Sequence, residues 1–213
     1  SLANLTAQCE ITSLTAPTAT DNCVGSIVGM HNASLPISSN TTITWTFDDG
    51  NGNTATQTQN VVINDNTAPV QAAPSLPTIL SECSVSSLTA PTATDNCSGS
   101  VIGTHNASLP ITSSTTILWT YTDLSGNSAT QSQTVTIDDV TAPTPDATTL
   151  ADVLGQCAII SLTTPSATDN CSAVTVSNNA SLPITSNTPV TWTYSAADGN
   201  QSTQLQNVIL NDE

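Results

Sequence analysis

The chain of 213 residues contains no lysine and no arginine. A protein of this length with average composition would carry roughly twenty or more of these residues. With 16 acidic residues and two histidines, its formal net charge is −16. Binding to nucleic acid and to anionic membrane surfaces depends on cationic side chains, so both are excluded. Schiff-base lysines, phosphate-binding P-loop lysines and arginine fingers are excluded for the same reason.

Aromatic residues make up only 3% of the chain and charged residues only 8%. No run of about 18 apolar residues occurs, so we expect no membrane insertion of this segment. The chain begins at Ser1 with no signal peptide, and we expect it to be a segment of a longer protein. Thr, Ser, Asn and Ala dominate, and Val, Ile and Leu recur in alternation, which predicts an all-β fold.

Internal repetition predicts the domain organisation. A pair of cysteines with constant spacing occurs three times at regular intervals, and the words ATDNC and NASLPI recur with it. We therefore expect three repeats, at residues 1–66, 75–140 and 149–213. The segments 67–74 and 141–148 contain proline and are expected to be semi-rigid linkers. The predicted architecture is a set of tandem Ig-like β-sandwich domains arranged as an extended rod.

One hairpin is predicted in every repeat. Residues 42–47 alternate Thr with apolar side chains, a Gly/Asn/Asp turn follows at 48–53, and a second strand follows at 54–64. We expect a further strand at 26–29, a short strand around Cys9 and Ile11, and a turn at 17–21. The tryptophans fall on the apolar face of the first hairpin strand and are expected to fill the cores: Trp45, Trp119 and Trp192.

These words together resemble the hyalin repeat (HYR), an Ig-like extracellular module. The stretch 123–130, which reads DLSGNSAT, is the closest to the family's pattern. The wording around NASLPI is similar to the SprB-type surface adhesins of gliding Bacteroidota. Hyalin repeats often carry a further cysteine after the G-N-x-A-T word, where this chain has Gln57, Gln131 and Gln204.

The cysteines have two interpretations. Zinc or redox chemistry needs closely spaced ligands such as C-x-x-C, and these cysteines stand alone. An even number per repeat in an extracellular chain favours structural disulfides. We therefore expect one local disulfide in each repeat, which gives the pairs Cys9–Cys23, Cys83–Cys97 and Cys157–Cys171.

Acidic residues gather in two places that could hold calcium, the only cofactor we consider. The hairpin turn offers oxygens at 48–53, but the other repeats do not keep this set, and turn chemistry alone explains it. The better candidates lie where one repeat meets the next: Asp65, Asp138, Asp139 and Asp212. Asp21, Asp95 and Asp169 recur beside them in the TDNC word. The alternative is solvated carboxylates and Asx turns.

No catalytic constellation recurs, so we expect no enzyme. His31 and His105 are replaced by Asn178 in the third repeat and are expected to be exposed. We expect a structural stalk or fibre segment of a long, secreted, cell-surface adhesin that serves adhesion or gliding. Its partners are neighbouring repeats of the same chain and a surface ligand or polysaccharide. The alternative is a carbohydrate- or protein-binding module that acts through multivalency.

Trypsin cleaves after Lys and Arg, so the reduced and heat-denatured chain should remain intact in trypsin. A protease of broader specificity should digest the same sample. Gel electrophoresis of both digests checks this, and fragmentation by trypsin would contradict it.

Overall fold

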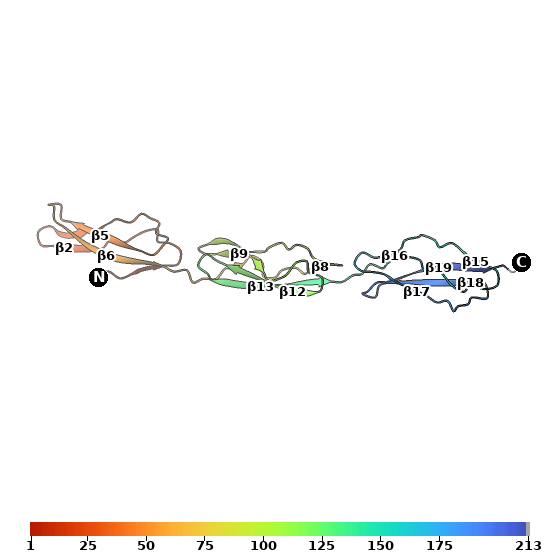
Figure 1. Cartoon of the computed structure of the whole chain (residues 1–213). Coiled ribbons are helices and arrows are strands. Elements are labelled where there is room, and N and C mark those ends of the chain that lie inside the picture. Colours follow the sequence, from red (N-terminus) through yellow and green to blue (C-terminus); the bar gives the residue numbers. More distant parts are fainter. Residues whose placement is uncertain (212–213) are drawn as a thin grey trace. The chain divides into compact units, whose positions relative to one another are not determined.

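The computed structural model describes residues 1–211, and this part of the chain is all-β, with no helix that could cross a membrane (Figure 1). The chain divides into two compact units. The first comprises residues 1–76, 89–106 and 118–132, and the second comprises 77–88, 107–117 and 133–213. The division falls inside the middle repeat, so the domain boundaries expected from the sequence stay a prediction.

Strands that correspond between the repeats occur in the same order, but the number of strands differs from repeat to repeat. In the first repeat they are β1 (Leu5–Ala7), β2 (Thr18–Asp21), β3 (Gly25–Val28), β4 (Met30–His31), β5 (Thr41–Asp48) and β6 (Thr54–Ile63). In the middle repeat they are β7 (Val70–Gln71), β8 (Ile79–Ser81), β9 (Thr92–Asp95), β10 (Gly99–Ile102), β11 (Thr104–His105), β12 (Thr115–Thr122) and β13 (Ser128–Ile137). In the third they are β14 (Thr144–Pro145), β15 (Val153–Gly155), β16 (Ala167–Thr168), β17 (Thr175–Asn178), β18 (Thr188–Ser195) and β19 (Gln201–Leu210).

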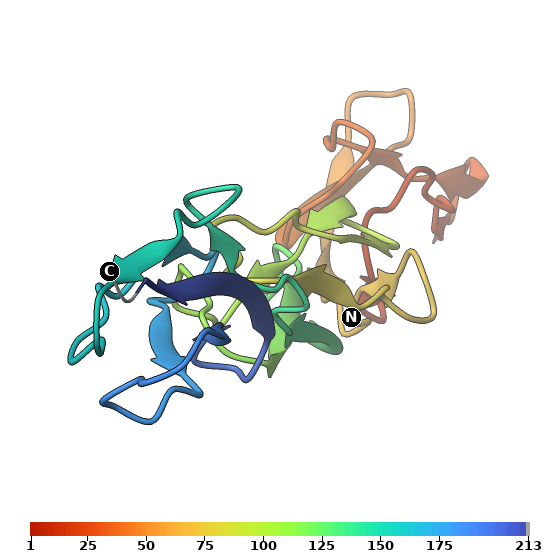
Figure 2. The same ribbon diagram turned by 90° about the vertical axis from the view of Figure 1, so that its right-hand side faces the viewer.

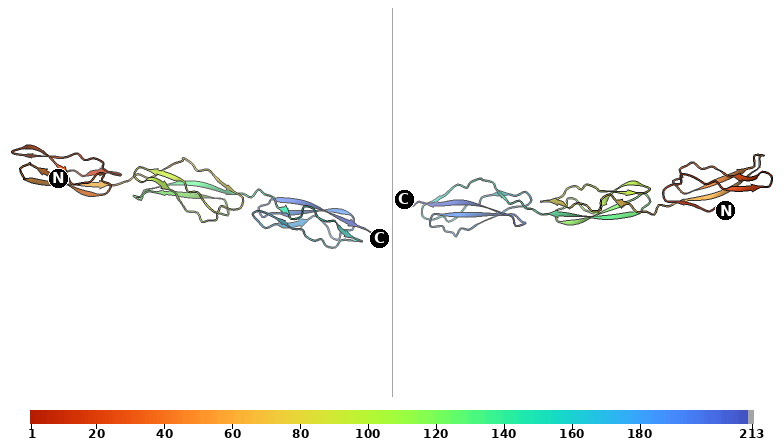
Figure 3. Two further views of the ribbon diagram at one scale, coloured as in Figure 1. Left: turned by 90° about the horizontal axis from the view of Figure 1, so that it is seen from above. Right: turned by 180° about the vertical axis from the view of Figure 1, so that it is seen from behind.

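The larger sheet of the first repeat has the order β1-β6-β5-β4. Strands β5 and β6 form the expected antiparallel hairpin, while β1 runs parallel to the end of β6, with Leu5 opposite Val61. The third repeat has the same order, β15-β19-β18-β17. These long hairpins can be followed in Figures 2 and 3. The hairpin that the alternating pattern predicts is thus confirmed.

A smaller sheet, β2 with β3, forms the second layer of the first repeat. Ala19 and Ile27 from this layer pack against the buried face of β5. The layers form a β-sandwich, which confirms the predicted fold class. Two local expectations were wrong. Residues 18–21 are strand β2, and the turn comes only after Asp21. Around Cys9 and Ile11 there is no strand, only an isolated bridge between Ile11 and Ile37.

This turn depends on an Asx turn and on glycine. Asp21 accepts hydrogen bonds from the amides of Cys23 and Val24, and Gly25 closes the turn with a φ of 84°. Gly99 has a φ of 72° in the same position. The third repeat has Ala173 there. Residues other than glycine rarely adopt a positive φ, so Ala173 disfavours this turn. Correspondingly, in the described third repeat β16 pairs with β14 only.

The segments expected to be linkers contain strands. β7 pairs with β9, with Val70 opposite Thr94, and β14 pairs with β16, with Thr144 opposite Thr168. Gln131 also donates its Nε2 to the carbonyl oxygen of Ala73 at 2.9 Å. Each of these segments is therefore bonded to the repeat that follows it.

Each core is small and centred on the alternating hairpin strand. Trp45, Trp119 and Trp192 are each 1% exposed, in agreement with the sequence pattern. In the first repeat the buried cluster consists of Ile37, Ile43, Trp45, Phe47 and Val61. In the third it consists of Ile159, Ile184, Val190, Trp192, Tyr194 and Val208.

The buried indole groups are satisfied by glutamines on the neighbouring strand. In the third repeat Trp192 donates its Nε1 to Gln206 at 2.9 Å, and Gln206 donates its Nε2 to the carbonyl oxygen of Ala151 at 2.9 Å. Trp45 and Gln59 form the same relay to Ala3. Because a buried donor without a partner is costly, the alternation of Gln along the second hairpin strand has a structural cause.

The recurring asparagine of NASLPI also has a structural role. Asn32, Asn106 and Asn179 accept a hydrogen bond through Oδ1 from the first strand of the hairpin, at 2.9, 3.0 and 2.8 Å. The donors are the amides of Thr44, Leu118 and Thr191. This side chain extends the sheet beyond the short edge strand, which explains why the asparagine recurs.

Replacing Gln206 with Leu should lower the local unfolding free energy of the third repeat by about 1–3 kcal/mol, because the Trp192 indole and the Ala151 carbonyl lose their partner. Amide hydrogen exchange of β18 and β19 measures this. Gln201→Leu at the exposed start of β19 is the matched control and should change stability by less than about 0.5 kcal/mol. Equal effects of the two substitutions would show that the relay does not stabilise the core.

Candidate functional site

Two disulfides cross the junctions between successive repeats. Cys9 bonds to Cys97, and Cys83 bonds to Cys171, each with a sequence separation of 88 residues and a Cα–Cα distance of 5.0 Å. Both cysteines of a pair lie within one compact unit. Cys23 and Cys157 are free and exposed in this chain. The local pairing expected from the sequence was therefore wrong.

The two cysteines of one repeat lie too far apart to form a disulfide. In the third repeat Cys157 follows β15, which pairs with the end of β19 at Val208–Leu210. Cys171 lies in the turn whose Ser172 accepts a hydrogen bond from the amide of Ala197, beside the start of β19. Ten strand residues separate these ends, roughly 33 Å, whereas a disulfide requires Cα atoms about 5–6 Å apart.

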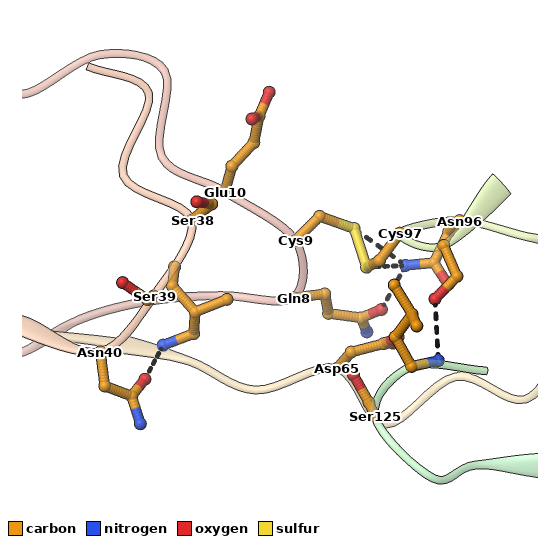
Figure 4. A pocket seen from close by; sticks show the side chains of 13 residues that line it. Gln8, Cys9, Glu10, Ser38, Ser39, Asn40, Asp65, Asn96, Cys97 and Ser125 are labelled. Carbon is orange, nitrogen blue, oxygen red and sulfur yellow. Dashed lines mark hydrogen bonds between the residues drawn. A yellow bond between two sulfur atoms is a disulfide. The ribbon is translucent and has the colours of Figure 1, made fainter.

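The first junction surrounds its disulfide with polar side chains (Figure 4). Asn96 donates its Nδ2 to Gln8 Oε1 at 2.9 Å, and Thr67 donates its Oγ1 to the same oxygen at 2.6 Å. A pocket of about 910 Å³ opens beside them, and its lining includes Ser39, Asp65 and Ser125. The side chains of two repeats thus meet around one covalent bond.

Two carboxylates face each other at this junction. Asp65 Oδ1 accepts a hydrogen bond from the Thr67 amide at 3.1 Å. Asp95 Oδ1 accepts two, from the amides of Cys97 and Ser98 at 2.9 and 2.7 Å. The second carboxylate oxygen of each, Oδ2, is buried and has no hydrogen-bond partner. Ligand atoms of Asp65, Asp95 and Cys97 lie within 4.8 Å of one another.

The second junction repeats this arrangement. Asp139 Oδ1 accepts from the Thr141 amide at 3.0 Å, and Asp169 Oδ2 accepts from the amides of Cys171 and Ser172 at 3.0 Å each. Asp139 Oδ2 and Asp169 Oδ1 are buried without a partner. Glu82 replaces Gln8 and lies within 4.8 Å of ligand atoms of Asp139 and Cys171. Asp169 lies near enough to act on Asp139 with its negative charge, as Glu82 does.

The two junctions differ in the ionisation of these acids. The Ser98 amide, which bonds the Asp95 carboxylate, holds the pKa of that carboxyl below its usual value despite its burial. For Asp139 the Thr141 amide also acts to lower the pKa. There, burial and the negative charges of Asp198, Asp169 and Glu82 outweigh it, so the pKa is raised. Crowded negative charge is therefore most marked at the second junction.

Not all the acids expected at the junctions take part. Asp138 is exposed and lies outside both carboxylate clusters that the described residues form, and Asp212 lies outside those residues. At the hairpin turn Asp49 is bonded by the Asn53 side chain and by the amides of Asn51 and Asn53, which lowers its pKa. Turn chemistry accounts for that site.

The hairpin asparagines were missed as junction residues. Asn127 donates its Nδ2 to the backbone oxygen of Asp65 at 3.2 Å, and Asn200 donates to that of Asp139 at 2.7 Å. Their recurrence in the G-N word was the available signal.

The histidines are exposed, and His31 and His105 pack edge-on against Trp45 and Trp119, with ring centroids 5.4 and 5.2 Å apart.

Peptide mapping without reduction should find the pairs Cys9–Cys97 and Cys83–Cys171, with free thiols only at Cys23 and Cys157. Because the chain has no tryptic site, the digest needs a different protease, such as pepsin at acid pH, which also suppresses disulfide exchange. A peptide that joins Cys9 to Cys23 would contradict the assignment.

Residues 69–137 match the family model described as an HYR-like domain with 4 cysteines. The match begins one residue before β7 and includes two cysteines, Cys83 and Cys97. The chain is also 33% identical over 208 residues to Hyalin of Strongylocentrotus purpuratus. This alignment covers 85% of the chain and 17% of the relative, so the chain spans about a sixth of the relative's length.

Among solved structures, the chain is similar to extracellular cadherin domains 1–4 of protocadherin gamma B7, at 11% identity and a TM-score of 0.37 over 93% of this chain and 66% of that one. It is also similar to Drosophila N-cadherin EC1–4, at 12% identity and a TM-score of 0.35 over 92% and 63%. Scores this low show no common arrangement or function.

The resemblance seen in the repeated words thus agrees with the family match in the middle repeat and with the similarity that extends along most of the chain. Together these findings support a hyalin-repeat family for this chain, with an HYR-like domain at residues 69–137.

Proposed function

We propose that this chain is a segment of an extracellular adhesive stalk, whose repeats form an extended rod and are joined covalently. The observation that carries the proposal is the pair of disulfides that link each repeat to the next. Disulfides persist in oxidising compartments, which supports a location outside the cell. The similarity to hyalin supports a repetitive, adhesion-type protein.

The two free cysteines are consistent with the same pattern of disulfides between successive repeats. Cys23 holds in the first repeat the position that Cys97 holds in the second, and Cys157 holds in the third the position of Cys83. Each free cysteine thus corresponds to one that is bonded elsewhere in the chain. In a longer array both would pair with adjoining repeats. We further propose that such a stalk serves adhesion or gliding at a cell surface, as the similarity to the SprB-type adhesins implies.

Small-angle X-ray scattering of the intact chain tests the extended arrangement. Three beads, each about 30–40 Å long, give a rod of about 100 Å with a radius of gyration near 30 Å. A compact protein of 213 residues would give about 17 Å. A value near the lower figure would refute the stalk.

A glycan array separates the stalk from a carbohydrate-binding module. The stalk predicts no saturable binding to any one sugar class at micromolar chain concentration, because the tryptophans that sugar sites often expose are buried in the cores. Saturable micromolar binding would instead support the multivalent binding module.

A further inference from the structure

We propose that each junction binds one divalent cation, Ca²⁺, between two aspartates of successive repeats. At the first junction the ligands are Asp65 and Asp95, and at the second they are Asp139 and Asp169. The proposal concerns a metal site that the stalk function does not require. The aspartates at both junctions each have a buried carboxylate oxygen without a hydrogen-bond partner.

Burial makes the first junction unusual. Asp95 is only 5% exposed, and its Oδ1 accepts two amide hydrogen bonds, whereas its Oδ2 has no partner. Asp65 Oδ2 is buried and lacks a partner as well. Buried polar oxygens are almost always bonded in native proteins, and buried charges are paired or coordinate metals. Two unsatisfied carboxylate oxygens at one place therefore point to an absent positive partner.

No side chain can supply this positive partner. The sequence contains no Lys and no Arg, so a salt bridge with either is impossible. The two histidines are committed elsewhere, since His31 and His105 pack against Trp45 and Trp119. A bound cation remains as the means of neutralising both carboxylates while they stay ionised.

The spacing and the atom types favour a hard cation. Two oxygens bound to one Ca²⁺ at 2.3–2.6 Å lie no more than about 5 Å apart, and the ligand atoms here lie within 4.8 Å of one another. The Cys97 sulfur is already part of a disulfide, so it offers no thiolate for a softer metal. Ca²⁺ also tolerates irregular coordination completed by water, whereas Mg²⁺ demands a near-octahedral site.

The first repeat provides an internal comparison. Asp21 makes the same turn as Asp95, with amide hydrogen bonds of 2.7 and 3.0 Å from Cys23 and Val24. Asp21 is not among the carboxylates of the described residues that carry a buried oxygen without a partner. The turn alone thus does not create the site, which requires the aspartate of the preceding repeat.

Calorimetric titration of the metal-free chain with CaCl₂ tests the proposal, together with melting temperatures in EDTA and in Ca²⁺. We expect two Ca²⁺ per chain, one in Asp95→Asn, one in Asp169→Asn and none in the double variant. Asn keeps the size of the side chain and the acceptor for the turn. Asp21→Asn is the matched control and should still bind two.

We expect Ca²⁺ to raise the melting temperature of the parent chain and of Asp21→Asn but not that of the double variant. In EDTA the double variant should melt close to the parent, because each Asn keeps the oxygen that accepts the amide hydrogen bonds of the turn. If it melts lower, Asp65→Asn with Asp139→Asn replaces it as the test. The proposal would be overturned if no heat of binding appears at about 10 mM Ca²⁺, a concentration above the dissociation constants of weak extracellular sites. Undiminished binding in the double variants, or equal binding of Mg²⁺, would overturn it as well.

Discussion

The small size of each hydrophobic core is the constraint on which the rest of this structure depends. In the first and third repeats only five and six residues form the buried cluster, with one tryptophan at the centre of each. A domain this small has little apolar area to offset the conformational entropy of its chain. Its buried polar groups must therefore have hydrogen-bond partners, because each one left without a partner would cost a large part of the domain's stability. The Gln relays to the indoles and the Asn side chains that extend the edge strands achieve this.

Negative charge without any basic side chain is the second constraint. Most of the acids that structure the turns are stabilised by backbone amides, as Asp21 and Asp49 are. This arrangement needs no cation, because amide dipoles favour the ionised carboxylate. Backbone amides do not satisfy the junction aspartates fully, since each has a second carboxylate oxygen that is buried and lacks a hydrogen-bond donor. The same composition thus suits the turns but provides no basic side chain for the junction carboxylates.

The sequence predicted the hairpins and the cores well because both depend on local alternation. The strand with Trp45 at its centre and the Gly/Asn turn after it follow from neighbouring residues alone. The disulfides could not be predicted in the same way. The two cysteines of one repeat lie at its opposite ends, and the bonded partners, with a sequence separation of 88, meet only once successive repeats pack together. Likewise, proline in the segment 67–74 indicated a linker, whereas strand pairing bonds Val70 to the following repeat.

The acids were predicted in part, for a related reason. Asp65 and Asp139 were expected at the junctions from their place in the repeat, but so was Asp138, which is exposed. Which of two adjacent aspartates points inward depends on the strand register at the end of β13. The contribution of Asn127 depends on a contact with the repeat that precedes its own.

The staggered disulfides also determine how tension would pass through the molecule. The backbone from Cys9 to Cys171 would measure about 550 Å when fully stretched. The shortest covalent route instead crosses both disulfides and uses only the backbone from Cys83 to Cys97, which would measure about 50 Å. A force applied between Cys9 and Cys171 therefore bypasses the hairpins of the first and middle repeats and their tryptophan cores. In an array of such repeats, the contour length along this route would therefore stay nearly constant even where individual sandwiches have unfolded.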